Sequence, residues 1–333
     1  MNECEAPLSF IRLFTHSILH AFNQSRIAMS IEIKNLTKFY GTQKALDNVS
    51  FSVGSGTVVG FLGPNGAGKS TLMKIVTGLL SPTSGTVLVE GMDVAESSSE
   101  IRRLIGYLPE NNPLYLDMYV KEYLQYTANL YHLTNTDKVV DEVIERTGLG
   151  PECKKKIGEL SKGYKQRVGL SQAIIHNPRV LILDEPTTGL DPNQLVEIRN
   201  LILELGREKT ILLSTHIMQE VQAICHQMAI LDHGVLVANG SPEQIEKTIG
   251  NSRRQIEVEF NLPVDEKMLL QIANIVAVEK TAASTYVLES DADTDIRQDV
   301  FNFAVQHGLA VLAMQLKQKS MEDVFHELTK SKQ

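Results

Sequence analysis

The sequence predicts an α/β protein in which a large domain built on a buried parallel sheet precedes a small α+β domain. Two segments, VLILDEP (180–186) and TILLSTH (210–216), carry continuous apolar runs, which are typical of strands buried on both faces of a parallel sheet. After Gly240 the pattern changes to short strands and helices. The 333 residues, 43% of them hydrophobic, are enough for one large domain or two ordinary ones.

Three strands are expected near the start of the large domain. Apolar residues in 31–36 predict the first strand, and the alternation in NVSFSV (48–53) is typical of a half-buried second strand. The third, TVVGFLG (57–63), is a short apolar run that ends in glycine. A helix over 69–80 follows, and a turn at SPTSG (81–85) ends it. The apolar residues on one face of this helix are Leu72, Ile75, Val76, Leu79 and Leu80.

Residues 113–178 predict a mainly helical subdomain. Apolar residues recur there at helical spacing in two stripes, which are Val120, Tyr123, Leu124, Ala128 and Tyr131, and then Val139, Val140, Val143 and Ile144. The apolar runs at 180–186 and 210–216 then return the chain to the parallel sheet.

The polar segment IGNSRRQ (249–255) predicts a linker, so we place the domain boundary after residue 248. The small domain, 249–333, begins with six elements in the order of a split, ferredoxin-like βαββαβ unit. In sequence we expect a strand at 256–260, a helix at 264–274, strands at 275–280 and 285–289, a helix at 294–307, a strand at 309–316 and a last helix at 320–329.

Residues 1–28 precede this pattern, and two interpretations stay open. Met29 begins MSIEIKNLTKFYG, which looks like a natural start for the first strand, so the extension could be a misassigned start. Alternatively, LSFIRLFTHSILHAF (8–22) forms a short amphipathic helix. The residues before it are acidic rather than basic, which argues against a secretory signal.

Composition argues against several other classes of protein. The net charge of −8 is unfavourable for general affinity to DNA or RNA, which needs clustered lysine and arginine. Cys4, Cys153 and Cys225 are far apart and lack CxxC spacing, so we expect free thiols in a reducing cytosol. No run of about 18 apolar residues is present, so no membrane-spanning helix is expected.

The segment GPNGAGKS (63–70) fits the pattern G-x-x-x-x-G-K-[ST] in full, between an apolar strand and a helix, which is the setting of a P-loop. Its glycines let successive N–H groups point at phosphate oxygens, and the helix N-terminus adds positive charge. Lys69 is expected to reach the β- and γ-phosphates, and Ser70 to offer its hydroxyl to Mg²⁺. The predicted nucleotide-binding residues are Gly63, Pro64, Asn65, Gly66, Ala67, Gly68, Lys69, Ser70 and Thr71.

Two acids, Asp184 and Glu185, follow the apolar run at 180–183. They emerge at the C-terminal end of the strand, where ligands bind in open α/β sheets. We expect Asp184 to hold Mg²⁺ through water, and Glu185 to act as general base for the water that attacks the γ-phosphate. With the P-loop, these acids predict a nucleotide hydrolase.

Further motifs between residues 30 and about 245 resemble those of the ATP-binding subunits of ABC transporters, and they come in the family's order. They are KFYG (38–41) with Tyr40 where an aromatic residue stacks on adenine, GYLPE (106–110) at the Q-loop, LSKGYKQR (160–167) as the signature, TTGLDP (187–192) as the D-loop with Asp191, and STH (214–216) with the switch histidine, His216. The resemblance implies that residues 29–248 form an ABC-type ATP-binding domain that uses ATP and Mg²⁺, with catalytic roles for Glu185, His216 and Lys69.

The resemblance also implies that the site needs two domains. In the family two ATP-binding domains pack head to tail, and each ATP lies between the P-loop of one and the signature of the other. Ser161 and the backbone of Gly163 would therefore contact a γ-phosphate held by a second copy or a paralogue, since hydroxyl and N–H groups at a helix N-terminus bind anions. Ser161 is also expected to cap the helix that starts at 162, which contributes about 1 kcal/mol.

Two departures from the family pattern bear on the site. Lys162 and Tyr164 stand in the signature where glycine and glutamine are usual. Glu110 stands in the Q-loop in place of glutamine. A carboxylate at this position could bind Mg²⁺, but it would repel the γ-phosphate unless the metal lies between them.

A chain without a membrane span would work with separate permease subunits, at the cytoplasmic face of the inner membrane, as the motor of an ABC transporter. Nucleotide binding would close the dimer and hydrolysis would open it. IGYLPENNPLYLDMYVKEYL (105–124) and SMEDVFHELT (320–329) resemble an export-type subgroup that includes the gliding-motility ATP-binding proteins. No nucleic-acid partner is expected.

Other roles stay open. An ABC ATPase that acts in translation usually carries two cassettes in tandem, whereas this chain has one P-loop. An ABC ATPase of DNA maintenance has a long coiled coil between P-loop and signature, and the segment between Lys69 and Ser161 lacks sustained heptads. The small C-terminal domain could also serve as a ligand-sensing regulator, because a fold does not reveal its role.

A chain that starts at Met29 should fold and hydrolyse ATP at the rate of the full chain, because every element and motif predicted for the two domains lies within residues 29–333. Thermal unfolding and phosphate release of the two proteins, measured side by side, check this. Loss of folding in the shorter chain would show that residues 1–28 belong to the folded structure.

Overall fold

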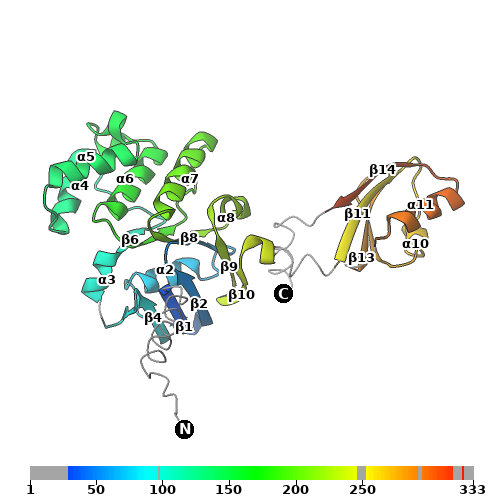
Figure 1. The fold of residues 1–333 in the computed structure, drawn as a ribbon, viewed down its shortest axis with the longest axis horizontal. Helices are drawn as coiled ribbons and strands as arrows, with labels where there is room; N and C mark the ends of the chain where they lie inside the picture. Colours follow the sequence, from blue (N-terminus) through cyan, green and yellow to red (C-terminus); the bar gives the residue numbers. More distant parts are fainter. Residues whose placement is uncertain (1–28, 97, 246–252, 292–294, 318–324, 326–333) are drawn as a thin grey trace, which may run out of the picture. The chain divides into compact units, whose positions relative to one another are not determined.

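The computed structural model describes residues 29–96, 98–245, 253–291, 295–317 and 325 (Figure 1). The chain divides into two compact units. The first contains the described residues up to 226 and residues 231–236, and the second contains residues 227–230 and the described residues from 237 onwards. The expectations for residues 1–28, for most of the 249–255 linker and, apart from Phe325, for the last helix lie outside the described residues.

An antiparallel sheet opens the first unit. Its strands are β1 (Met29–Tyr40), β2 (Gln43–Gly54), β4 (Ser84–Val89) and β5 (Met92–Asp93), in the order β2-β1-β4-β5. In β2 the side chains of Val49, Phe51 and Val53 are buried, whereas the two serines between them are exposed. The alternation that predicted a half-buried strand is therefore confirmed.

A second sheet has the order β10-β9-β3-β8-β7-β6. Its strands are β3 (Val58–Leu62), β6 (Ile105–Leu108), β7 (Val180–Asp184), β8 (Thr210–Thr215), β9 (Gln227–Asp232) and β10 (Val235–Gly240). The four neighbours β3, β8, β7 and β6 run parallel. Every residue of β7 and β8 is buried, so the prediction of parallel strands from continuous apolar runs is confirmed.

Helices surround this sheet. They are α2 (Lys69–Val76), α3 (Ser98–Leu104), α7 (Pro192–Gly206) and α8 (Met218–Ile224). Helix α2 ends earlier than predicted because Gly78 takes a φ of 71° just after the C-cap Thr77, as is common where glycine ends a helix. Leu79, expected on the apolar face, is consequently 60% exposed.

The helical subdomain consists of α4 (Val120–Leu130), α5 (Thr136–Arg146), two short 3₁₀ turns (Gly150–Glu152 and Ile157–Glu159) and α6 (Lys162–Ile174), and it forms the green part of Figure 1. Its predicted stripes meet the sheet in one apolar core, which includes Val120, Leu124 and Val140 together with Leu181 and Leu213. None of the described helices is long and apolar enough to cross a membrane.

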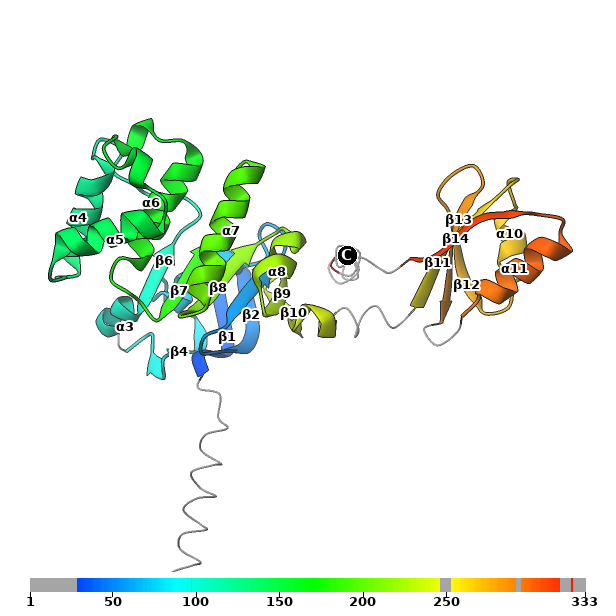
Figure 2. The same ribbon diagram turned by 45° about the horizontal axis from the view of Figure 1, so that its top comes forward.

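The second unit contains β11 (Arg253–Phe260), α10 (Glu266–Leu269), β12 (Ile275–Lys280), β13 (Thr285–Asp291), α11 (Arg297–Gln306) and β14 (Val311–Lys317). The sheet order is β12-β13-β11-β14 with antiparallel neighbours, and both helices lie on one face of it (Figure 2). The predicted split βαββαβ arrangement is therefore confirmed. Helix α10 is shorter than the predicted 264–274, and Asn274, at a φ of 65°, leads into β12.

Gly106 in β6 is packed so closely on α6 that a Cβ there would lie 2.0 Å from the carbonyl oxygen of Ala173. The substitution Gly106→Ala should therefore lower the free energy of unfolding by about 1–3 kcal/mol, because backbone cannot yield as a side chain does. Gly150→Ala is the matched control, since Gly150 has an unstrained φ and no atom within 4 Å of the added methyl group. Urea unfolding measures both, and equal midpoints would contradict the tight contact.

Candidate functional site

A cleft of about 790 Å³ lies in the first unit, beside the loop that joins β3 to α2. Most of the residues predicted to bind nucleotide border it. The lining consists of Tyr40, Gln43, Lys44, Ala45, Asn65, Gly66, Ala67, Gly68, Lys69, Ser70, Thr71, Glu110, Glu185, Thr188, His216 and His233.

The loop from Gly63 to Gly68 needs glycine for two separate reasons. Gly66 and Gly68 take φ values of 83° and 105°, in the left-handed region that side chains disfavour. At Gly63 the constraint is space, because a Cβ would lie 2.3 Å from the carbonyl oxygen of Leu231. Gly68 then serves as N-cap of α2, so the free N–H groups of this helix begin at the cleft.

Lys69 extends back over this loop. Its Nζ donates hydrogen bonds to the carbonyl oxygens of Gly63 (2.7 Å) and Pro64 (3.2 Å) and lies 3.7 Å from Glu185 Oε1, and its side chain is 6% exposed. Burial lowers the pKa of Lys69 below its ordinary value, and neighbouring carboxylates, that of Glu185 foremost, oppose this shift. A phosphate entering the cleft would therefore meet a cation held at its floor.

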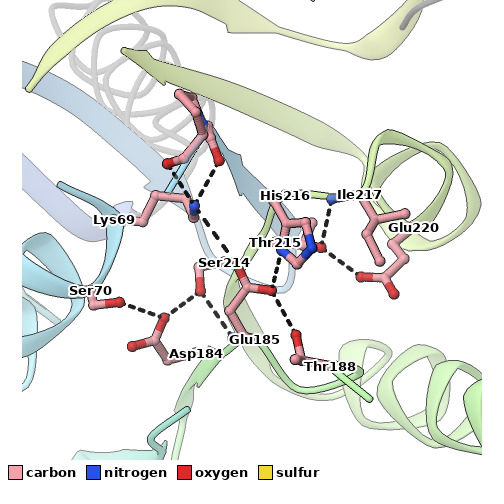
Figure 3. A network of polar contacts seen from close by, with 12 residues as sticks. Lys69, Ser70, Asp184, Glu185, Thr188, Ser214, Thr215, His216, Ile217 and Glu220 are labelled. Carbon is pink, nitrogen blue, oxygen red and sulfur yellow. Dashed lines mark hydrogen bonds and ion pairs between the residues drawn. The ribbon is translucent and has the colours of Figure 1, made fainter. Parts of the chain in front are cut away.

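Asp184 is 2% exposed at the end of β7 and receives two hydrogen bonds. Ser70 Oγ, from α2, donates at 3.2 Å, and Ser214 Oγ, from β8, donates at 2.5 Å to the same carboxylate oxygen (Figure 3). Ser214 Oγ also accepts from the backbone N–H of Glu185 at 3.0 Å. One serine hydroxyl thus fixes both acids relative to each other.

Glu185 has a φ of 51°, which is unusual for a residue with a side chain. Its Oε2 accepts a hydrogen bond from Thr188 Oγ1 at 3.0 Å and lies 2.9 Å from Nδ1 of His216 (Figure 3). Because Glu185 is also next to Lys69, the cleft brings a carboxylate, an imidazole and an ammonium group together. Ser214 and Thr188 were not among the predicted site residues, although they lie in the motifs STH (214–216) and TTGLDP (187–192).

The oxygen atoms beside the P-loop fit Mg²⁺. Ser70 supplies a hydroxyl and Asp184 a carboxylate, and Glu110 borders the same cleft. Among the described residues no cluster of three or more His, Cys, Asp or Glu side chains could hold a metal by itself. Mg²⁺ keeps several waters and is usually bound by one or two protein ligands together with substrate phosphates, so the hydroxyl of Ser70 and the carboxylate of Asp184 fit it.

Three predicted residues lie on helix N-termini rather than on the cleft. Ser161 is the N-cap of α6, where its Oγ accepts from the N–H of Tyr164 at 3.4 Å, so the capping role expected of it is present. Asp191 caps α7 in the same way, through the N–H groups of residues 193 and 194, each at 3.0 Å. Gly163 packs against Gln194 of α7. None of these three borders the described cleft of its own chain.

This arrangement defines a P-loop ATPase of the ABC class. A family model described as "ABC transporter" matches residues 46–188, and one described as the C-terminal domain of DrrA1-3-like ATP-binding proteins matches residues 240–329. The chain belongs to the ATP-binding subunits of ABC transporters, of the DrrA-like type, and it is an ATPase.

Similar proteins and structures agree with this family. An uncharacterised ABC transporter ATP-binding protein, YxlF of Bacillus subtilis (strain 168), is 35% identical over 89% of this chain and 98% of its own length. The bacitracin transport ATP-binding protein BcrA of Bacillus licheniformis is 34% identical over 90% of this chain and 96% of its own length. A solved ATP-binding subunit of an ABC transporter shares 32% identity at a TM-score of 0.61, covering 66% of this chain and 93% of that one.

The substitution Lys69→Ala should lower the affinity for ATP at least about a hundredfold, because two charged hydrogen bonds to phosphate contribute about 1.5–3 kcal/mol each. Calorimetric titration of the full chain with ATP and Mg²⁺ measures the change. Lys74→Ala is the matched control, since it removes an exposed lysine of the same helix outside the cleft. Unchanged affinity in Lys69→Ala would remove Lys69 from the nucleotide site.

Proposed function

We propose that this chain is the motor subunit of an export-type ABC transporter, in which Glu185, His216 and Lys69 carry out ATP hydrolysis. The observation that carries the proposal is the contact of one buried carboxylate, Glu185, with both the P-loop lysine and the switch histidine. Export is favoured by the names of similar proteins, which include bacitracin transport, linearmycin resistance and Nod factor export.

The first step is the binding of the triphosphate. The backbone N–H groups of Asn65, Gly66 and Gly68, together with those at the N-terminus of α2, would bind its phosphates. Lys69 exchanges its hydrogen bonds to the carbonyl oxygens of Gly63 and Pro64 for phosphate oxygens. Tyr40 is 47% exposed on the wall of the cleft, where its ring can stack on adenine.

Hydrolysis transfers the γ-phosphoryl group of ATP to water. Glu185 takes the proton of the attacking water, and the bond to the β-phosphate oxygen breaks to give ADP and phosphate. His216 orients the Glu185 carboxylate through Nδ1, and Thr188 does so through its hydroxyl. Ser70, Asp184 and Glu110 would hold Mg²⁺, which would neutralise charge on the phosphates.

The signature residues serve a second ATP-binding domain, either a second copy or a paralogue. Ser161, the backbone of Gly163 and Asp191 lie at the N-termini of two helices that touch at Gln194, which gives one surface that can face a partner's γ-phosphate. A solved cassette that is 25% identical to this chain is described as dimeric, in a post-hydrolysis state with ADP and phosphate.

The motor would act on separate permease subunits at the cytoplasmic face of the inner membrane, as a peripheral protein. We place its ATP-binding domain at residues 29–248 and its accessory domain at 249–333. The narrower resemblance to gliding-motility proteins stays a prediction, as does a regulatory role of the accessory domain.

The substitution Glu185→Gln should leave ATP binding intact, slow phosphate release by about 10²–10⁴-fold, and make the protein accumulate as a dimer with ATP and Mg²⁺. Glutamine keeps the size of the side chain but cannot accept the proton. Single-turnover phosphate release and light scattering measure the two effects.

The control for this prediction is Glu142→Gln, which removes an exposed acid of α5. A wild-type rate in Glu185→Gln would exclude Glu185 as the base. A slow variant that stays monomeric with ATP would instead contradict a head-to-tail site shared with a second copy of this chain, and would leave a paralogue as the partner.

A further inference from the structure

Glu220 is a buried carboxylate next to the site that the proposed chemistry leaves unused. It lies in the first turn of α8 and is 1% exposed. Burying a charged group is unfavourable unless hydrogen bonds compensate for the lost water. Its Oε2 accepts a hydrogen bond from Thr215 Oγ1 at 2.7 Å, while Oε1 has no partner among the described side chains. The contact with Thr215 is therefore the one to explain.

Thr215 is fully buried at the end of β8, and its hydroxyl is engaged on both sides. It donates to Glu220 and accepts from the backbone N–H of Ile217 at 3.1 Å (Figure 3). A hydroxyl has a single hydrogen to donate, so the bond to Glu220 directs the oxygen lone pairs at the Ile217 N–H. The backbone on both sides of His216 is thus fixed by one side chain.

His216 itself has little packing to hold it. Its side chain is 45% exposed, and its Nδ1 lies 2.9 Å from Glu185 Oε2. The direction in which the ring leaves the backbone therefore decides whether the imidazole meets Glu185.

We propose that Thr215 and Glu220 are positioning residues that hold the His216 imidazole against the Glu185 carboxylate. Glu220 orients the Thr215 hydroxyl, Thr215 anchors the N–H of Ile217, and the chain between them presents His216 to the cleft. The role requires a hydrogen-bond acceptor at position 220 and a hydroxyl at position 215, and it does not require the negative charge of Glu220. The inference rests on the proposed functions of Glu185 and His216.

The test compares steady-state ATP hydrolysis by full-length variants. Thr215→Val keeps the shape of the side chain but removes the hydroxyl, so kcat should fall at least about tenfold, since small misplacements of reacting groups are costly. The KM for ATP should stay within about twofold of wild type, because the P-loop is untouched. Thr215→Ser keeps a hydroxyl at position 215, and Glu220→Gln keeps an acceptor oxygen at position 220. Both variants should therefore hydrolyse ATP near the wild-type rate.

Thr210→Val is the matched control. Thr210 is a buried threonine at the start of the same strand, and its hydroxyl accepts a hydrogen bond from Gly56 N–H at 3.0 Å, away from His216. It should lower the unfolding temperature but leave kcat unchanged. An equal fall of kcat in Thr210→Val and Thr215→Val would show a general loss of stability and overturn the proposal.

A spectroscopic readout separates position from stability. The ¹⁵N resonances of the His216 ring report which nitrogen carries the proton, and His216→Gln assigns them by their absence. In wild type we expect Nδ1–H, bonded to Glu185, and in Thr215→Val a shift towards the free imidazole. Unchanged resonances and a wild-type kcat in Thr215→Val would overturn the inference. If Glu185→Gln is slow in the same assay, the proposed function still holds.

Discussion

The hydrogen bonds that converge on Asp184 are the interaction on which the site depends. They tie the end of β7 to the start of α2 through Ser70 and to the end of β8 through Ser214. A buried carboxylate is unfavourable without such partners. The bonds that stabilise Asp184 at the C-terminal ends of these strands therefore also fix the position of the P-loop. Ser214 further holds the backbone of Glu185, whose φ of 51° would otherwise be costly.

The charges of the cleft give a physical reason for the proposed Mg²⁺. Three carboxylates, those of Glu110, Asp184 and Glu185, surround Lys69, which is partly neutralised by the last of them. A triphosphate adds further negative charge to this cluster, and like charges at short range repel strongly where water is scarce. A divalent cation that arrives with the nucleotide offsets this repulsion. The acid at position 110 strengthens the requirement relative to a neutral glutamine.

Much of the fold could be predicted because local signals were unambiguous. The apolar runs of β7 and β8 were typical of buried parallel strands, and the βαββαβ order predicted for the second unit agrees with its sheet order β12-β13-β11-β14. Helix ends were harder to predict. Gly78, with its positive φ, ends α2, and α10 ends at Leu269, although the apolar pattern continues beyond both ends. The role of Ser214 could not be read from sequence, because it depends on the register of β7 against β8, across thirty residues of chain. The proposed partner of Ser161 is a phosphate bound to a second domain, so contacts within one chain do not include it.

The proposed role of Ser161 would separate the requirements of folding from those of activity. As the N-cap of α6, its side-chain oxygen accepts a hydrogen bond from a backbone N–H group. Aspartate or asparagine can cap a helix equally well. Towards a phosphate the serine hydroxyl acts as a donor, which a carboxylate cannot do. Variant screens scored by protein abundance would thus rate Ser161→Asp as tolerated, while screens scored by transport would rate it as inactive. At such positions a substitution changes activity without changing protein abundance. A difference of this kind marks residues that act on a group bound to another molecule.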